Sequence, residues 1–382
     1  MTNNTQGVSE LSFLSPAKGA TKRMDFSLFY FASADVGQSS DKYRLLIEGA
    51  KFADTHGFAA VWTPERHFYD FGGLYPNPSV TSAALATVTE RIQLRAGSVV
   101  LPLHDPLRIA EEWAVVDNLS HGRVAISFAS GWQPNDFVIA PQNYANRKEV
   151  MLRGIETVRR LWRGEKVRRR DGNGTEIEVS ILPHPIQREL PIWVTASGSP
   201  ETFRLAGEIG ANLLTHLLGQ SIEQLAGKIA IYRSAWRERG HGPGTGHVTL
   251  MLHTFIGNSV DEVREQVRGP FSDYLRSSVD LWLARKPGQD IGDFSEEEIA
   301  DLVSYAFDRY FETSGLFGTP GTCLRMIDRL KAIGVDEVAC LIDFGVDFDV
   351  VLSSLHDLDT LRQLSNPSSG HMKGETQSFA GG

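Results

Sequence analysis

The sequence contains few cysteines and no long apolar run. Only Cys323 and Cys340 occur among 382 residues, and neither belongs to a metal-spaced cluster, so we expect buried thiols in a reducing cytoplasm and no bound metal. No apolar stretch approaches the ~18 residues that a membrane-spanning helix needs. The N-terminal region also lacks the apolar core of a signal peptide. These absences favour a cytoplasmic protein without membrane contact.

An excess of positive charge is missing as well. The chain has 38 Lys and Arg residues against 47 Asp and Glu residues, which gives a net charge of −9. That balance argues against nucleic acid as a partner. The basic residues 168–170 are followed by the turn-forming residues 171–174, so we interpret the run as the exposed end of a hairpin.

Nucleotide-binding glycine patterns are the third absence, since neither a G-x-G-x-x-G turn after the first strand nor a Walker motif occurs. What the chain does contain is a repeated alternation of apolar strands with helix-like sequence. Parallel strands buried on both faces require such apolar runs, and eight of them predict a (β/α)8 TIM barrel rather than an open doubly wound sheet. The expected strands are residues 24–31, 58–63, 92–100, 123–128, 192–196, 211–216, 248–256 and 337–342.

Turn residues divide the chain further. Gly57, Gly122, Gly210 and Gly334 are expected to end helices, and Asp105 before a proline is expected to start one. The expected helices cover about 41–57, 78–90, 105–122, 147–162, 199–210, 222–239 and 319–334. The expected organisation is a mobile arm (1–22), one barrel domain (23–364) with an extra hairpin near 166–190 and an insertion near 270–316 that is irregular around 287–294, and a disordered tail (365–382).

In a barrel of this kind, reactive groups gather where the strands end. Each candidate there also has a structural alternative that the sequence leaves open. Glu65, Arg66 and His67 could form a surface ion cluster, and His216 and His253 could be core histidines. Asp343 could cap a turn, and Trp132 could serve packing. The candidates after the strands are Glu65, Arg66, His67, Phe68, Ser98, Ser130, Trp132, His216, His253 and Asp343.

The segment Ser197-Gly198-Ser199 is more specific. It follows a strand and precedes Pro200, so Ser199 is expected to be the first cap of a helix. The free N–H groups of a helix N-terminus form an anion site, and serine hydroxyls add donors. A phosphate could bind there without lysine or arginine; the alternative is an ordinary capped helix.

Together these segments resemble the bacterial luciferase-like, FMN-dependent monooxygenases. The resemblance extends from about residue 24 to 361. Residues 131–137 with 147–149 look closest to the mupirocin-type subfamily of natural-product biosynthesis. The matching segments are VWTPERHF (61–68), GSVVLPLHDPLR (97–108), LSHGR (119–123) and FGTP (317–320).

The resemblance implies an FMN site in the barrel mouth. It places a cis peptide between Gly97 and Ser98 under the flavin ring, Ser130 beside the ring, and the phosphate in the turn 197–199. Glu65, Phe68, Trp132, His253 and Asp343 would then surround the substrate.

One position departs from the family pattern, because Arg66 stands where luciferase has a catalytic histidine. Arg66 cannot act as a base at neutral pH, but it could stabilise an anion on the flavin or hold an acidic substrate group. His67 or His216 could transfer protons. Light-emitting aldehyde chemistry is therefore not expected.

The resulting hypothesis is a two-component monooxygenase. A separate NAD(P)H:flavin reductase would supply reduced FMN, O2 would add to the flavin C4a carbon to give a peroxyflavin, and one oxygen atom would pass to a secondary-metabolite intermediate, either a free small molecule or one bound to a carrier protein. Arg66 and Arg108 could contribute a basic rim for a carrier, and family members commonly form homodimers. The alternatives are an F420-dependent hydride-transfer enzyme, a non-catalytic flavin-binding protein and a barrel without flavin.

Overall fold

The computed structural model describes residues 22–33, 41–242, 244–283 and 295–367. Eight parallel strands follow one another around a closed barrel, since β11 pairs with both β9 and β1 and β8 pairs with β9. The predicted (β/α)8 TIM barrel is therefore confirmed. In order around the barrel, the strands are β1 (Asp25–Phe29), β2 (Ala60–Thr63), β3 (Gln93–Val100), β4 (Val124–Ala129), β7 (Ile192–Thr195), β8 (Asn212–His216), β9 (Val248–Ile256) and β11 (Glu337–Leu341).

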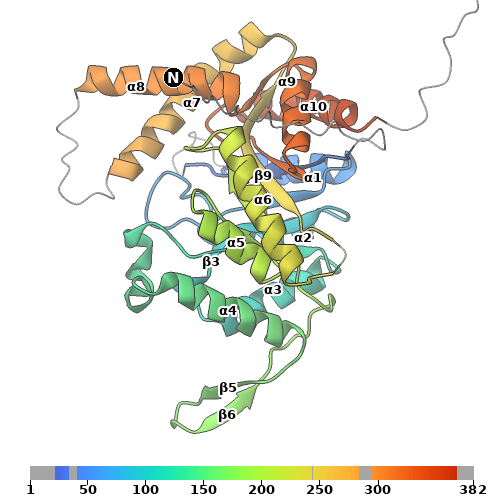
Figure 1. Cartoon of the computed structure of the whole chain (residues 1–382), viewed down its shortest axis with the longest axis vertical. Helices are drawn as coiled ribbons and strands as arrows, with labels where there is room; N and C mark the ends of the chain where they lie inside the picture. The colour runs from blue at the N-terminus through green and yellow to red at the C-terminus, as the bar shows by residue number, and fades with distance from the viewer. Residues whose placement is uncertain (1–21, 34–40, 243, 284–294, 368–382) are drawn as a thin grey trace, which may run out of the picture.

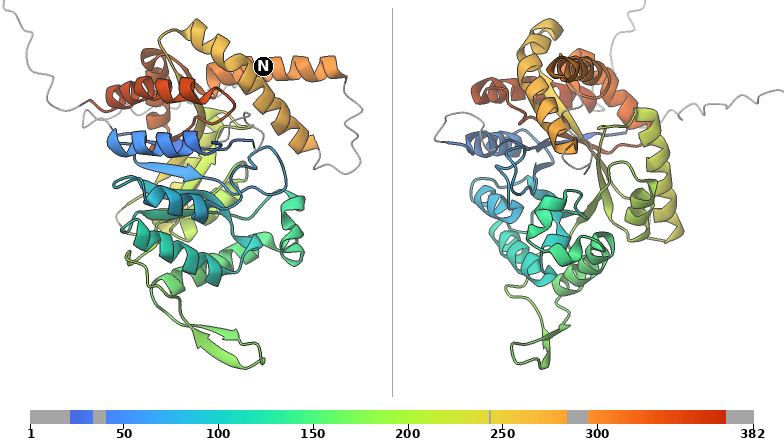
Figure 2. Two further views of the ribbon diagram at one scale, coloured as in Figure 1. Left: turned by 180° about the vertical axis from the view of Figure 1, so that it is seen from behind. Right: turned by 90° about the vertical axis from the view of Figure 1, so that its left-hand side faces the viewer.

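Helices enclose the barrel on its outer side (Figures 1 and 2). Three short 3-10 helices, η1 (Leu101–Leu103), η2 (Pro134–Val138) and η3 (Pro141–Asn143), follow β3 and β4. The α-helices around the strands are α1 (Arg44–Thr55), α2 (Pro78–Ala86), α3 (Pro106–Leu119), α4 (Arg147–Trp162), α5 (Pro200–Glu208), α6 (Ile222–Glu238), α9 (Pro320–Ala332) and α10 (Phe348–Ser365).

Two additions extend the barrel. An antiparallel hairpin of β5 (Val167–Arg170) and β6 (Glu176–Val179) projects at the bottom of Figure 1 and carries the basic run. Helices α7 (Val260–Leu283) and α8 (Glu296–Thr313) lie at the top of the same view and pack against each other. The short strand β10 (Leu316–Gly318) pairs in parallel with the last residues of β9. The irregular segment expected around 287–294 lies outside the described residues.

Local capping explains where several elements begin and end. Asp105 accepts a hydrogen bond from the N–H of Leu107 and caps α3 as predicted. Helix α2 ends at Ala86 instead of continuing to residue 90, because the chain then turns and the carboxylate of Asp54 accepts the N–H groups of Glu90, Arg91 and Ile92. Helix α1 starts at Arg44, about three residues later than expected.

Both ends of the described chain contact the barrel. Lys22 donates to the carbonyl of Val335 and pairs with Asp336, 2.8 Å away. Ser365 is the last residue of α10, and the Asn366 side chain bonds both the N–H and the carbonyl of Met24. Residues 22 and 366 therefore both take part in contacts with the barrel.

The barrel interior contains a charged pair that the sequence pattern does not predict. Arg95 on β3 donates to Glu337 on β11 over 2.7 Å, and the carboxylate also accepts from Ser27, Trp62 and His247. Glu337 has no exposed surface. Isolated charges are strongly disfavoured in such a place, so this network makes the pair tolerable inside the barrel.

The free thiols Cys323 and Cys340 are buried in the hydrophobic core, as expected. Among the helices that the structure describes, none combines the length and apolar character that a bilayer crossing requires.

Candidate active site

The predicted site residues lie on one edge of the barrel, because all eight strands are parallel and each candidate stands at or just after the C-terminal end of a strand. Glu65 follows β2 by two residues, Gly97 and Ser98 lie in the second half of β3, and the turn 197–199 follows β7. The structure therefore gathers side chains that are up to 278 residues apart in the chain, from Glu65 to Asp343.

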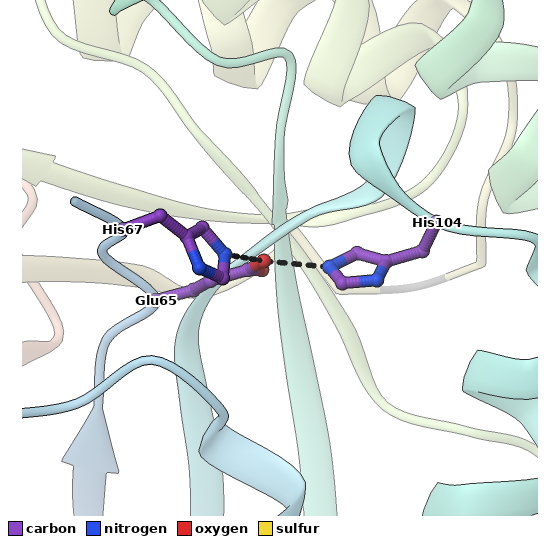
Figure 3. A group of neighbouring side chains, drawn as sticks. All are labelled: Glu65, His67 and His104. Atoms are coloured by element: carbon purple, nitrogen blue, oxygen red, sulfur yellow. Dashed lines mark hydrogen bonds and ion pairs between the residues drawn. The ribbon is translucent and has the colours of Figure 1, made fainter. Parts of the chain in front are cut away.

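Glu65 is the centre of a three-residue cluster (Figure 3). Its Oε1 atom lies 2.7 Å from Nε2 of His67 and 2.6 Å from Nε2 of His104, and its Oε2 atom accepts the N–H of Val100 over 2.7 Å. The side chain of Glu65 is buried, whereas His67 and His104 are partly exposed. Both imidazoles are thus anchored on one carboxylate and remain accessible from the barrel mouth. We name this group the Glu65 cluster.

Electrostatics favour a charged carboxylate in the Glu65 cluster. Burial raises the pKa of Glu65, but the hydrogen bonds from His104, His67 and Val100 outweigh this effect and hold the pKa below its usual value. Burial lowers the pKa of His104, yet its contact with Glu65 produces a net increase. The cluster therefore combines a buried anion with a histidine whose protonated form is stabilised.

The same three side chains have the composition of a metal site, since two imidazoles and a carboxylate suit several divalent metals. Their nearest ligand atoms lie within 4.8 Å of one another. Each imidazole nitrogen, however, stands at hydrogen-bond distance from the same carboxylate oxygen, so a cation would have to replace both hydrogen bonds. The observed arrangement is a hydrogen-bonded relay.

Arg66 lies next to Glu65 in the sequence but contacts residues outside the Glu65 cluster. It is 3 % exposed, and its Nη1 atom lies 3.2 Å from Oδ2 of Asp136 on η2. The rings of Tyr69 and Trp132 lie 4.8 and 5.2 Å from its guanidinium carbon, within range of cation–π attraction. Arg66 is therefore paired with an acidic side chain in this structure, a contact that the sequence did not indicate.

The peptide between Gly97 and Ser98 is cis, as the family resemblance implied. Space is tight on one side of it, since a Cβ atom on Gly97 would lie 2.8 Å from the Phe29 ring. On the other side, the Ser98 hydroxyl lies 2.6 Å from that of Thr195, which lies 2.7 Å from the hydroxyl of Ser127. This hydroxyl chain connects the cis peptide with β7, two residues before the turn 197–199.

The turn 197–199 is open and polar. Ser199 is the N-cap of α5, as predicted, but its hydroxyl makes no capping hydrogen bond. Ser197, Gly198 and Ser199 are all exposed, and a Cβ atom on Gly198 would meet nothing within 4 Å. An uncommitted hydroxyl at a helix N-terminus, with free space beside it, suits a phosphate. These residues therefore fit the phosphate end of FMN.

Ser130, Phe68 and Trp132 lie around the rim. Ser130 is half-buried directly after β4. Phe68 is 64 % exposed and Trp132 is 43 % exposed. The loop 66–76 forms a cavity of about 510 Å³ next to these rings, which is a size that small-molecule sites commonly have.

His216 and His253 are poorly suited to hold a proton at neutral pH. Burial and the nearby Lys228 lower the pKa of His216 to about 4, and its Nδ1 atom accepts the N–H of Leu218. Burial lowers the pKa of His253 to about 3, and its ring is enclosed by aromatic rings that include Phe271 and Tyr274. Both imidazoles are neutral at pH 7, so His253 fits the core alternative.

Asp343 lies behind the rim and is 2 % exposed. It accepts a 2.8 Å hydrogen bond from the hydroxyl of Tyr75. Burial raises the pKa of Asp343 to about 7, although the bonds from Tyr75 and from the N–H of Ala32 act in the opposite direction. A carboxyl group with this pKa changes its charge near neutral pH.

This pKa predicts how stability depends on pH. Because the folded pKa lies above the unfolded value near 4, the folded state binds the extra proton between about pH 4 and pH 7, and stability falls as the pH rises through that window. Urea unfolding at pH 5 and pH 8 measures this fall in the free energy of unfolding. In Asp343→Asn the fall should be smaller than in the wild type by about 2–4 kcal/mol. Asp301→Asn, an exposed change on α8, should retain the wild-type slope. Equal slopes in all three proteins would contradict the assignment.

Sequence reasoning missed two members of this site. His104 lies inside a quoted motif but received no role, and Asp136 likewise had none. His104 follows η1, a turn of three residues that brings the imidazole back to Glu65. The sequence did show a polar residue, His104, directly after the turn that follows a strand. That position alone does not show that Glu65 is its partner.

Comparisons with known proteins identify the family of this chain. A family model described as "Luciferase-like monooxygenase" matches residues 24–337. The oxygenase component of the flavin-dependent trigonelline monooxygenase of Acinetobacter baylyi is 29% identical over 349 residues, which cover 87% of this chain and 92% of that protein.

Two solved structures share the fold. One is the oxygenating constituent of 3,6-diketocamphane monooxygenase of Pseudomonas putida in complex with FMN, with a TM-score of 0.67, 20% identity, and coverage of 90% of this chain and 96% of that one. The other is an F420-dependent secondary alcohol dehydrogenase, also with a TM-score of 0.67, with 16% identity and coverage of 91% and 100%. The fold alone therefore does not separate the two cofactors.

Proposed function

The chain belongs to the luciferase-like monooxygenase family and is a flavin-dependent monooxygenase, and we propose that it is the oxygenase component of a two-component system that uses reduced FMN and O2. The open turn 197–199 carries this proposal, because its uncommitted Ser199 hydroxyl and the N-terminus of α5 suit a phosphate. A separate NAD(P)H:flavin reductase would supply the reduced cofactor, since the sequence lacks a nicotinamide fingerprint.

The roles of the residues follow from their contacts. FMN, when bound in its reduced form, supplies the electrons that activate O2. Ser197, Gly198 and Ser199 would hold its phosphate, and Gly97, Ser98 and Ser130 would lie along its ring. His67, whose Nε2 atom is anchored by Glu65, would hold or transfer a proton at its other ring nitrogen, Nδ1. The loop 66–76 and Trp132 would exclude water from the reacting atoms.

The proposed substrate is a secondary-metabolite intermediate, either free or attached to a carrier protein. The resemblance of residues 131–137 to the natural-product subfamily supports this class. The exposed Phe68 and Trp132 beside a cavity of about 510 Å³ suit an organic substrate that is mostly apolar. A homodimer and a cytoplasmic location also belong to this proposal.

The first experiment is an anaerobic titration of the full chain with reduced FMN, oxidised FMN and reduced F420, followed by rapid mixing with O2. We expect reduced FMN to bind most tightly and to reoxidise more slowly than free FMN. NADH should be consumed only after a flavin reductase is added. Binding of F420 without binding of FMN would instead indicate hydride transfer. Binding of neither cofactor would leave a barrel without a redox role.

The phosphate turn provides a second test. Ser199→Asp should weaken binding of reduced FMN at least about 10-fold, because a carboxylate would face the phosphate dianion. Aspartate is itself a good N-cap, so α5 should remain folded. Reduced riboflavin, which has no phosphate, should bind wild type and variant within about twofold. The matched control is Ser295→Asp at the N-cap of α8. It should leave the affinities for reduced FMN and reduced riboflavin unchanged. An equal loss of affinity for reduced FMN and reduced riboflavin in Ser199→Asp would show that the turn does not bind the phosphate.

A further inference from the structure

Four buried polar atoms around Arg66 have no hydrogen-bond partner among the described residues. They are Nε and Nη2 of Arg66, Oδ1 of Asp136 and Oε1 of Gln133. Arg66, Gln133 and Asp136 are only 3, 2 and 4 % exposed. Native proteins leave few buried polar groups without a hydrogen bond. Such a group often bonds a ligand or an ordered water. Three of these atoms belong to one ion pair, and the fourth belongs to a side chain that bonds Tyr69 beside that pair, so together they indicate a binding position.

The chemistry of the four atoms defines what they would accept. Nε and Nη2 of Arg66 donate hydrogen bonds, whereas Oδ1 of Asp136 and Oε1 of Gln133 accept them. The Arg66–Asp136 pair is neutral as a whole. A carboxylate would satisfy the two donors but would face two acceptor oxygens. A neutral group that presents an acceptor next to a donor satisfies both sides.

The surroundings supply access and a lid. Arg66 and Tyr69 line the cavity of about 510 Å³. The Tyr69 hydroxyl accepts from the side-chain amides of Gln133, over 2.7 Å, and Asn135, and its ring covers the guanidinium group. A ligand that enters from the cavity would displace Tyr69 from these contacts and reach the four atoms.

We propose that Arg66, Asp136 and Gln133 form a recognition site for a neutral group with adjacent donor and acceptor, such as a primary carboxamide or a lactam, on an aromatic or similarly planar molecule. Trp132, 5.2 Å from the guanidinium carbon, and the exposed Phe68 supply the apolar surface for that molecule. Its identification as the monooxygenase substrate rests on the proposed function. The recognition site itself does not depend on flavin.

The test measures binding of three probes of similar shape to the full chain by ligand-observed NMR at pH 7.5. Benzamide carries a donor and an acceptor, methyl benzoate carries acceptors only, and benzoate is an anion. We expect benzamide to bind about 10-fold more tightly than either of the others, as the added hydrogen bonds predict. Equal affinities for the three probes would mean that water alone fills the cluster, and tightest binding of benzoate would indicate an anion site; either result overturns the proposal.

Variants give the proposal a signature that simple packing would not produce. Asp136→Asn leaves the charge of Arg66 unbalanced, so the preference should change from benzamide to benzoate. Asp70→Asn removes an exposed carboxylate from the same cavity wall without touching the four atoms, and it should retain the wild-type preference. Arg66→Lys keeps the charge but loses the planar edge, so benzamide should lose its 10-fold advantage. An unchanged preference in Asp136→Asn or Arg66→Lys would refute the site.

Titration of the same samples with reduced FMN separates the two proposals. Selective benzamide binding without FMN binding would support the recognition site and reject the proposed function. FMN binding without a preference for benzamide would support the proposed function and reject the recognition site.

Discussion

Replacing Glu65 with glutamine is expected to lower the rate of substrate oxygenation about 100-fold, as the loss of general acid–base catalysis typically does, and to change binding of reduced FMN less than about threefold. The amide retains the size of the carboxylate but not its charge. His67 and His104 would lose the anion that both contact at 2.7 and 2.6 Å. The imidazole of His67 would then no longer be held in one orientation.

A spectroscopic readout distinguishes this role from a loss of structure. Glu65 raises the pKa of His104 in the wild type, so an NMR titration of Glu65→Gln should show that pKa shifted downward. Glu111→Gln, which changes an exposed carboxylate on α3, should leave both the oxygenation rate and the pKa of His104 unaltered. An oxygenation rate that stays at its wild-type value while the pKa of His104 falls would remove the Glu65 cluster from the mechanism.

The fold could be predicted because its signals are local and repeated. Each of the eight expected segments overlaps a barrel strand, and the expected glycines lie near the helix ends; Gly57 and Gly334, for example, adopt positive φ values of 76° and 96°. Apolar runs, caps and turn glycines act within a few residues of the chain, so one sequence is enough to locate them. Boundaries such as the end of α2 were missed because a distant residue, Asp54, decides them.

The site was predictable only in part. The strand ends and the family motifs located Glu65, Ser98 and the turn 197–199 on the same rim. They could not show that His104 returns to Glu65, or that Asp136 neutralises Arg66, because both contacts depend on how loops from neighbouring strands fold over the barrel mouth. Sequence spacing carries no information about such pairings.

The same reasoning applies to the barrel interior and leads to the largest expected effect on stability. Arg95 and Glu337 are 242 positions apart and meet because β11 closes the barrel. Replacing Arg95 with leucine should destabilise the protein by about 3–5 kcal/mol, since it leaves a buried carboxylate without its cationic partner. The rings of Trp62 and Trp193, 4.8 and 4.6 Å from the guanidinium carbon, would also lose a packed neighbour. Urea unfolding at pH 7 measures the change.

A double substitution separates the cost of the unpaired charge from the cost of lost packing. Arg95→Leu with Glu337→Met removes both charges, so it should recover at least about half of the loss. Arg153→Leu breaks the exposed pair with Glu149 on α4, where the side chains are 68% and 64% exposed, and should cost less than about 0.5 kcal/mol. If the double variant were no more stable than Arg95→Leu alone, packing around the guanidinium group, and not charge pairing, would be what stabilises this layer of the barrel.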